Sequence, residues 1–396
     1  MGPLDGLRVI DAGTLAAAPL VATYLGELGA DVIKVEQPAG GDHLRRWGAQ
    51  KDGVGLYWKS VGRGKRSVTL DLRSPRGQEL FLELAKRSDA VLENFRPGTL
   101  ERWNIGWETL HAANPDLVLL RISGFGQTGP YASKPGFGTL VEAMSGFAHV
   151  TGEPGGPPTL PPFPLADAVA GLAGTYAVLA ALYHRDAKGG GGQFIDLALL
   201  EPLMRMLEPI FLEYDQLGNN RERRGNRMPE VVPRNAYRCS DGRWLAISAS
   251  APTIALRVFR AIGRPELADD PAYADPQSRL EHSDEIDALV ADWAAGQTRD
   301  EAIALLEREE VAVAPVHDVA SLFEDAHVVA RGVFERVSDE ELGEVRVQSV
   351  APRFSETPGE VGPLAPRLGA HNEEVYVGLL GLSEAELADL RAEGIV

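Results

Sequence analysis

Residues 7–36, LRVIDAGTLAAAPLVATYLGELGADVIKVE, carry the pattern that decides the fold. Leu7 to Asp11 is a short apolar run typical of a buried strand, Pro19 to Leu28 has apolar residues at helical spacing, and Asp31 to Glu36 predicts a second strand. The alternation continues, with strands predicted over 67–72, 90–93 and 117–122 and a helix over 74–87. Strands that alternate with helices in this way favour an α/β fold, a Rossmann-like parallel sheet covered by helices on both faces.

Beyond this sheet the sequence changes character twice. Thr151 to Pro164 holds six prolines and predicts a loop, and residues 219–233 form a polar, arginine-rich crossing between domains. Strand and helix patterns from Tyr237 to about His327 predict a smaller α/β domain. We therefore expect the large domain to begin with residues 1–218, the small domain with its linker to span 219–327, and the return segment 328–396 to complete the large domain.

Composition excludes several classes of protein. The chain has 396 residues with 57 acidic and 39 basic side chains, and its net charge of −18 disfavours nucleic-acid binding. A single cysteine, Cys239, excludes a disulfide framework and fits a reducing compartment, and the scattered histidines suggest no metal site. No signal peptide is apparent, and the apolar run 168–183 is shorter than the ~20 residues of a membrane span. We expect a cytoplasmic protein without a membrane partner, in which that run forms a buried helix.

The first strand–helix junction resembles a dinucleotide-binding turn in place but not in sequence. Gly13 to Pro19 has one glycine where three are expected, although Glu36 ends the second strand where such folds carry a ribose-binding acid. Nicotinamide binding is therefore disfavoured. The cations of residues 63–66, with Arg96 and Arg102 beyond them, suit the phosphates of another cofactor. A solvated charged loop is the alternative interpretation of these cations.

Segments spread in order over the whole chain resemble the family III CoA-transferases, which include formyl-CoA transferase, the carnitine CoA-transferases and α-methylacyl-CoA racemase. The matching segments are ELGAD at 27–31, KVE at 34–36, GKRS at 64–67, ENFRPG at 93–98, GFGQTGP at 124–130, LAD at 165–167, AIGRPEL at 261–267 and LGAH at 368–371. The resemblance implies a Rossmann-like large domain with an inserted small domain, and two chains interlocked as a homodimer. It also implies a coenzyme A thioester and a carboxylic acid as substrates, with no permanently bound cofactor and no metal.

The same resemblance implies site residues by motif position. The implied CoA-binding residues are Lys65, Asn94, Phe95, Arg96, Arg102 and Lys134. The implied oxyanion or substrate pocket comprises Ala16, Gly136, Phe137 and Gly138.

Asp167 is the predicted catalytic residue. Because it stands before an alanine-rich run, the bare sequence predicts a helix N-cap, whereas the resemblance places it at the family's nucleophilic aspartate. The two interpretations are compatible, because a helix N-terminus favours the ionised carboxylate that a nucleophile requires. We expect CoA transfer through an aspartyl-CoA thioester on this residue.

Two other activities remain as alternatives. An acyl-CoA racemase needs a proton-transferring histidine, which by motif position falls at Phe137, a residue that cannot transfer protons. A catalytically silent CoA-binding protein is the second alternative. Formyl-CoA transferase carries a glutamine near Ala16 and a glycine-rich flap, both absent here, so small dicarboxylic acids such as succinate, malate, citramalate or mesaconate are expected instead. Arg234 either holds a distal carboxylate or is a solvated linker residue.

Overall fold

The computed structural model describes residues 2–396, which form two compact units. The first unit comprises the chain up to Ala148 together with Leu160–Asn219 and Gly332–Val396, and the second comprises His149–Thr159 and Asn220–Arg331. We expected the whole proline-rich segment to belong to the large domain. Its first part, up to Thr159, belongs instead to the second unit.

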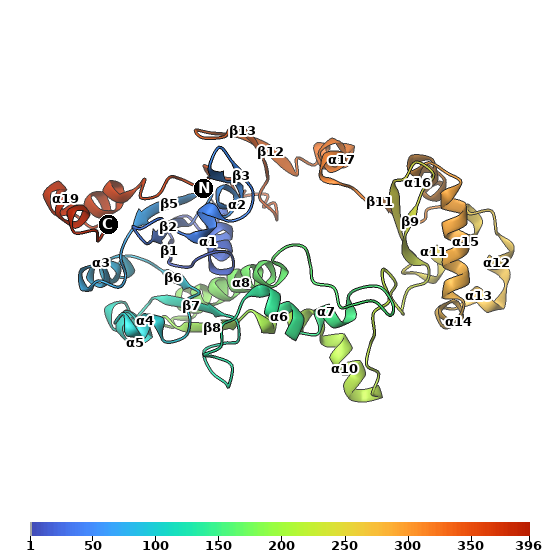
Figure 1. The fold of residues 1–396 in the computed structure, drawn as a ribbon, viewed down its shortest axis with the longest axis horizontal. Coiled ribbons are helices and arrows are strands. Elements are labelled where there is room, and N and C mark those ends of the chain that lie inside the picture. Colours follow the sequence, from blue (N-terminus) through green and yellow to red (C-terminus); the bar gives the residue numbers. More distant parts are fainter. Residues whose placement is uncertain (1) are drawn as a thin grey trace. The chain divides into compact units, whose positions relative to one another are not determined.

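The first unit is built on a six-stranded parallel sheet (Figure 1). Its strands are β1 (Arg8–Asp11), β2 (Asp31–Glu36), β5 (Lys65–Thr69), β6 (Ala90–Glu93), β7 (Val118–Ser123) and β8 (Phe194–Ala198). Their order is β5-β2-β1-β6-β7-β8, so successive connections lead away from β1 on one side and away from β6 on the other. The expected α/β fold with a parallel sheet is confirmed, and its topological switch point, where such folds bind ligands, lies between β1 and β6.

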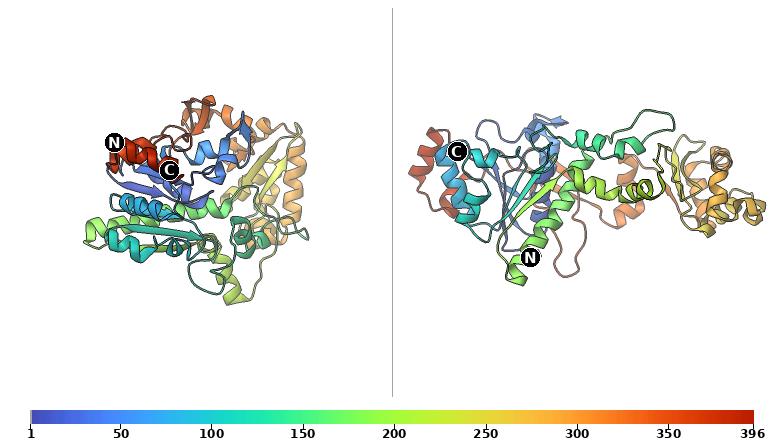
Figure 2. Two further views of the ribbon diagram at one scale, coloured as in Figure 1. Left: turned by 60° about the vertical axis from the view of Figure 1, so that its left-hand side comes forward. Right: turned by 90° about the horizontal axis from the view of Figure 1, so that it is seen from below.

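Helices cover both faces because alternate strand residues point to opposite sides. Val9 packs into a core with α1 (Ala17–Glu27) and α8 (Leu165–Lys188). Its neighbour Ile10 packs into the opposite core, which contains residues of α3 (Pro75–Ala85), α5 (Trp107–Ala113) and the C-terminal α19 (Glu384–Ala392) (Figure 2). The C-terminal segment is tied to the sheet by the Tyr376 hydroxyl, which donates to the Thr69 carbonyl at 2.7 Å. The return of the chain end therefore completes the large unit.

Helix α8 differs from the buried helix that the sequence predicts. It runs for 24 residues, longer than its most apolar run, and by length and composition it could cross a membrane. One side, including Ala166, Ala170 and Ala173, packs on α1 and the sheet. The other side leaves Leu172, Tyr176 and Tyr183 more than half exposed. The small residues allow the close contact with α1, while the larger apolar side chains are uncovered in the single chain.

Shorter elements complete the first unit. They are η1 (His43–Arg46), β3 (Gln50–Lys51), β4 (Val54–Gly55), α2 (Leu56–Val61), α4 (Thr99–Arg102), α6 (Gly138–Met144), α9 (Leu200–Met206), α10 (Glu208–Leu217), β12 (Phe334–Asp339), β13 (Gly343–Gln348) and η2 (Glu374–Leu379).

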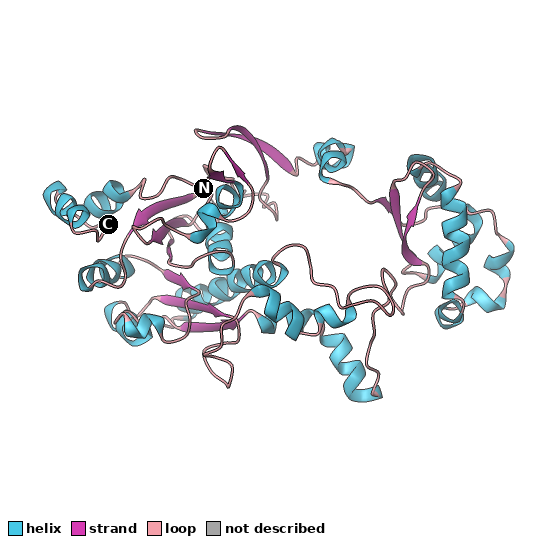
Figure 3. Cartoon of the chain, in the orientation of Figure 1, coloured by secondary structure: helices cyan, strands magenta, loops and turns pink. Residues whose placement is uncertain are grey.

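The second unit is a small α/β unit with an antiparallel sheet (Figure 3). The strands β9 (Arg234–Arg238), β10 (Trp244–Ser248) and β11 (Val313–Pro315) lie in the order β11-β10-β9. Leu245, Ile247 and Tyr237 pack with the helices into one apolar core. The helices of this unit are α11 (Pro252–Ala261), α12 (Glu266–Asp269), α13 (Pro271–Ala274), α14 (Pro276–Glu281), α15 (Ser283–Ala295), α16 (Arg299–Arg308), α17 (Val319–Glu324) and α18 (Ala326–Ala330); α7 (Phe147–Val150) lies at the boundary of the two units.

Candidate active site

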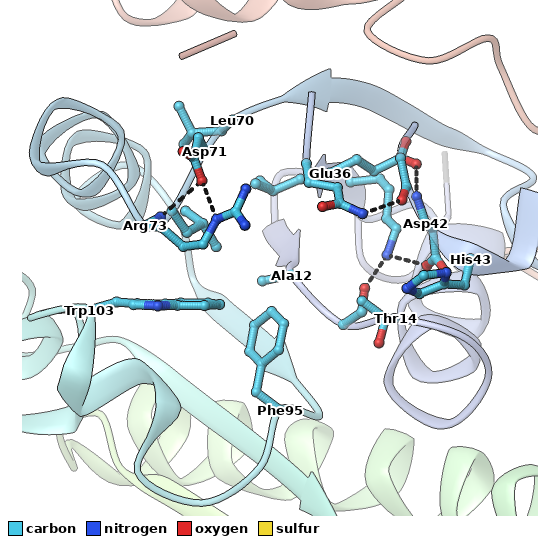
Figure 4. Close-up of a pocket in the computed structure, with 16 residues that line it drawn as sticks. Ala12, Thr14, Glu36, Asp42, His43, Leu70, Asp71, Arg73, Phe95 and Trp103 are labelled. Carbon is cyan, nitrogen blue, oxygen red and sulfur yellow. Dashed lines mark hydrogen bonds and ion pairs between the residues drawn. The ribbon is translucent and has the colours of Figure 1, made fainter. Parts of the chain in front are cut away.

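A cavity of about 350 Å³ opens at the carboxyl edge of the parallel sheet, at the switch point. Its walls come from the residues that follow β1, β2, β5 and β6, among them Ala12, Gly13, Thr14, Gln37, Leu70, Asp71, Leu72, Arg73, Phe95 and Trp103. Figure 4 shows Phe95 and Trp103 on one side of the cavity and Asp71 with Arg73 on the other. The aromatic rings meet edge to face with centroids 5.1 Å apart. The result is a largely apolar slot with an exposed Arg73–Asp71 ion pair of 2.9 Å in its wall, which suits a flat ligand.

Buried charges lie at the inner end of this cavity. Lys34 is completely buried, with its Nζ atom 3.4 Å from Asp11 and 3.1 Å from Asp42. Burial lowers the pKa of Lys34, but the two carboxylates more than offset burial, so its pKa is raised and the ammonium group stays charged.

Lys65 belongs to the same buried cluster, which corrects its expected role. Its Nζ atom lies 2.9 Å from Asp11 Oδ2 and 2.7 Å from the Pro19 carbonyl, and the residue is 4% exposed. Desolvation lowers its pKa. Because the ammonium group is enclosed and already bonded, Lys65 neutralises Asp11 at the end of β1 and is not placed to contact a phosphate.

The catalytic candidate, Asp167, lies in the first turn of α8. The helix begins at Leu165 with Pro164 at the cap position, so Asp167 is its third residue and the predicted N-cap is wrong. The backbone N–H groups of Asp167 itself and of Ala17, the first residue of α1, face the carboxylate and lower its pKa. The side chain therefore lies where the N-termini of two helices meet, an environment that favours negative charge.

Burial opposes that preference at Asp167. Desolvation, together with the nearby carboxylate of Glu142, raises the pKa of Asp167 to about 6, and the two backbone N–H groups lower it less. Glu142 is 2% exposed, and its Oε1 atom accepts a hydrogen bond from the Ala166 N–H group at 3.0 Å. The result is a carboxylate more basic than an ordinary aspartate but still ionised at neutral pH.

The surroundings of Asp167 include residues that the sequence did and did not reveal. Ala16, at the cap position of α1, and Gly138, at the start of α6, are buried near it, and their role in a substrate pocket stays a prediction. A Cβ atom on Gly138 would lie 2.4 Å from Asp167 Oδ2, so this approach requires glycine. Tyr57 was missed: burial raises its pKa, and the charge of Asp167 raises it further. No sequence pattern marks a tyrosine in a short helix more than 100 residues away.

The remaining expected residues are less closely gathered. Gly136 packs against the backbone of Gly124, and the Phe137 side chain is 61% exposed. Both polar atoms of the Asn94 amide bond to the backbone of Thr14.

Three expected phosphate ligands lie on the surface. Arg96, Arg102 and Lys134 are all exposed. Arg102 donates to the Thr99 hydroxyl at 2.8 Å, and the Lys134 ammonium group lies 3.4 Å above the Tyr131 ring. All three cations are accessible to an anion, in contrast to Lys65.

Arg234 lies in the second unit, at a pocket of about 400 Å³ that Arg223, Arg224 and Arg227 also line. Arg227 is neutralised by Asp284 and Asp287. Arg234 instead donates to the backbone carbonyl of Asn226, so its charge has no carboxylate partner in this pocket. Among the described residues, no group of His, Cys, Asp and Glu is arranged to hold a metal ion.

The sheet, the cavity at its switch point and the half-buried Asp167 carboxylate define a Rossmann-like α/β enzyme. The chain belongs to CoA-transferase family III, whose family model matches residues 4–372, and the resemblance noted in the sequence is thereby confirmed.

Relatives of known activity match almost end to end. The succinyl-CoA–D-citramalate CoA-transferase of Chloroflexus aurantiacus is 44% identical over 397 residues, covering 100% of this chain and 98% of the relative. The beta subunit of the succinyl-CoA–L-malate CoA-transferase of the same organism is also 44% identical, with the same coverage. The succinyl-CoA:mesaconate CoA-transferase of Haloarcula hispanica is 34% identical, covering 95% of this chain and 96% of the relative. The crystal structure of a CaiB/BaiF family protein from Brucella suis superposes with a TM-score of 0.84 at 33% identity, covering 96% of this chain and 99% of that one.

Proposed function

We propose that this CoA-transferase moves coenzyme A from succinyl-CoA to a second small dicarboxylic acid through a covalent intermediate on Asp167. The observation that carries the proposal is the half-buried Asp167 carboxylate between two helix N-termini, with its pKa raised to about 6. One loop connects it to the cavity: Gly13 and Thr14 line the cavity, and Ala17 reaches Asp167.

The chemistry consists of four exchanges at carbonyl carbon. The Asp167 carboxylate attacks the thioester carbonyl, the C–S bond breaks, and an acyl-aspartyl anhydride and CoA thiolate form. The thiolate attacks the aspartyl carbonyl and releases the first acid as its carboxylate, leaving an aspartyl-CoA thioester. The second acid attacks that thioester and forms a new anhydride, and the thiolate then attacks its acyl carbonyl. The new thioester leaves and Asp167 is restored as a carboxylate.

The structure suits these steps in two ways. A carboxylate with a raised pKa is a better nucleophile than an ordinary aspartate, and above about pH 6 it is still ionised. The Ala17 N–H group and the N-terminus of α8 can stabilise the oxyanion that forms on the aspartyl carbonyl.

We place the nucleotide part of coenzyme A in the cavity at the switch point. Phe95 and Trp103 offer an aromatic wall to the base, and Arg73, which is paired with Asp71, is an exposed cation of the cavity wall. Arg96, Arg102 and Lys134 remain proposed phosphate ligands because they are accessible. A resident cofactor or metal takes no part in the proposed reaction.

The proposed acids follow from the relatives and from the site. The relatives are named for succinyl-CoA with citramalate, malate or mesaconate. The small side chain of Ala16 beside Asp167 leaves more space than a glutamine would, which favours acids larger than formate.

We further propose that the chain acts as a cytoplasmic homodimer. Helix α10 has no buried residue, although Leu212, Tyr214 and Leu217 are apolar and between 59% and 71% exposed. On α8, Leu172 and Tyr176 are exposed to a similar degree. Monomers seldom expose so many large apolar side chains, and a second copy of the chain is the proposed cover. Light scattering at micromolar concentration tests this: a mass near twice 42.6 kDa supports the dimer, and a monomer overturns it.

Incubation with succinyl-CoA and each of several labelled acids, with mass-spectrometric detection of new thioesters, tests the activity. Hydroxylamine added during turnover should convert the activated aspartate into a hydroxamate on the peptide that contains Asp167. Binding of CoA without either product would favour the silent CoA-binding protein, and epimerisation without exchange would favour the racemase. Either result would overturn the proposal.

A further inference from the structure

The loop that joins β1 to α1 contains a leucine in a conformation that leucine rarely adopts. Leu15 has φ +60°, in the left-handed region that favours glycine. It stands two residues before Ala17, whose N–H group reaches Asp167. Residues held in this region without glycine tend to occur at functional sites, where surrounding contacts impose the conformation.

Asp42 supplies one of these contacts. Its Oδ1 atom accepts hydrogen bonds from the N–H groups of Leu15 at 3.0 Å and Leu44 at 2.9 Å, and its Oδ2 atom lies 3.1 Å from Lys34 Nζ. Burial alone would raise the pKa of Asp42, but Lys34 and the two N–H groups outweigh burial and lower it. A fixed, buried carboxylate therefore holds the strained residue, and its position is set in turn by a buried lysine of β2.

Asn94 supplies the second contact, from the end of β6. Its Oδ1 atom accepts from the Thr14 N–H group, and its Nδ2 atom donates to the Thr14 carbonyl, both at 2.7 Å. A paired amide clamp of this kind fixes the two peptide units on either side of Thr14. Two side chains distant in sequence thus restrain consecutive residues of the loop.

We propose that Asp42 and Asn94 are positioning residues, which hold the loop so that the Ala17 N–H group is directed at Asp167. The inference rests on the proposed nucleophilic role of Asp167. If the loop is released, the Ala17 N–H group moves away from the carboxylate, and this group is one of those that lower the pKa of Asp167. The carboxylate should then titrate at higher pH, and its oxyanion should lose a donor.

The test compares Asp42→Ala, Asp42→Asn and Asn94→Ala by the pH dependence of kcat in the full chain. We expect the two alanine variants to lose about tenfold in kcat at neutral pH, with the acidic limb of the profile moved upward from about 6. Asp42→Asn retains an acceptor for Leu15 and should stay closer to the wild type. The matched control is Asp89→Ala, which also removes an acceptor of a backbone N–H group and an ion pair, but at the opposite end of the sheet. It should leave the limb in place.

A rescue variant separates positioning from a loss of stability. Glycine adopts positive φ without side-chain strain, so Leu15→Gly added to Asp42→Ala should restore part of kcat and return the limb toward its wild-type position. If Asp42→Ala does not fold, Asn94→Ala must still show the shifted limb. Folded variants with the kcat and limb of the wild type would overturn the inference, provided Asp167→Ala is inactive. Activity that survives Asp167→Ala would overturn the proposed function instead.

Discussion

The carboxylate of Glu142 accepts a hydrogen bond from the N–H group of Ala166 at 3.0 Å, in the first turn of the helix that carries Asp167. A buried carboxylate thus shares the helix N-terminus with the half-buried carboxylate of Asp167. The bond fixes Glu142 in place, and its negative charge contributes to the raised pKa of Asp167.

The pH dependence of transfer should report this arrangement. Because Asp167 must be ionised to attack, kcat should fall as the pH drops through about 6, rather than through the usual range of an aspartate. Glu142→Gln retains an oxygen for Ala166 but removes the charge, so the limb should move to lower pH. Glu79→Gln, an exposed change on α3, serves as the control. An unmoved limb in Glu142→Gln would contradict the electrostatic coupling.

The effects of Asp167 on catalysis and on stability can be measured with two different substitutions. Asp167→Ala should abolish transfer and leave CoA affinity largely intact, because the proposed phosphate and base contacts lie elsewhere. Asp167→Asn should increase the free energy of unfolding at neutral pH, by up to about 3 kcal/mol, because it removes a buried charge. The sign follows from the raised folded-state pKa: the folded protein binds the proton more tightly, so wild-type stability falls as the pH rises from about 4 to about 6. Titration calorimetry with CoA and thermal unfolding at several pH values measure the two effects; a destabilised Asn variant would contradict the second.

The sequence predicted the large sheet closely because the spacing of apolar residues and the local composition indicate each strand and helix separately. The strand over Asp31–Glu36 is confirmed at both ends, and the first strand begins at Arg8, one residue after the expected Leu7. Helix α8 shows the limit of such patterns. An apolar run indicates a helix but does not distinguish a helix covered by its own chain from one with an uncovered side.

Site residues could be predicted where a motif marks them. They could not be predicted where tertiary contacts determine the direction and partners of a side chain. Motif position led to Asp167 and Gly138, which the structure brings together. The same reasoning assigned Lys65 to a phosphate, because the GKRS segment matches the family at that position. Its side chain turns inward to Asp11, a pairing across 54 residues that local sequence does not encode. The left-handed conformation of Leu15 is hidden from sequence for the same reason.

Gly138 offers a steric test of the nucleophile's position. In Gly138→Ala the new Cβ atom would lie 2.4 Å from Asp167 Oδ2, so the carboxylate or the start of α6 must shift. We expect kcat to fall at least tenfold with a small change in stability, because reacting groups tolerate little misplacement. Gly378→Ala is the matched control, since a Cβ atom there meets nothing within 4 Å. Equal kcat values in the two variants would place the reaction away from Asp167 Oδ2.

Lys65 and the exposed cations should behave differently when replaced. Lys65→Met leaves Asp11 short of a buried partner, so the free energy of unfolding should drop by about 3 kcal/mol. Arg102→Ala and Lys134→Ala should instead raise the apparent KM for the CoA thioester several-fold and leave thermal stability almost unchanged. Steady-state kinetics and thermal unfolding of the three variants show whether each side chain contributes to CoA binding or to stability. Lys65→Met with normal stability and a raised KM would reverse our assignment.

The choice of acid is tested most directly at Arg234. Its guanidinium lies in an arginine-lined pocket and is bonded to a backbone carbonyl rather than to a carboxylate, so its charge is available to an anion. If it recognises the second carboxylate of a dicarboxylic acid, Arg234→Ala should raise KM for succinate and malate about tenfold or more, and leave KM for a monocarboxylic acid of similar length unchanged. Arg238→Ala, an exposed change four residues along the same strand, controls for the loss of a surface charge. Equal effects of Arg234→Ala on mono- and dicarboxylic acids would show that Arg234 is a solvated residue, and that the preference for dicarboxylic acids is set by other groups.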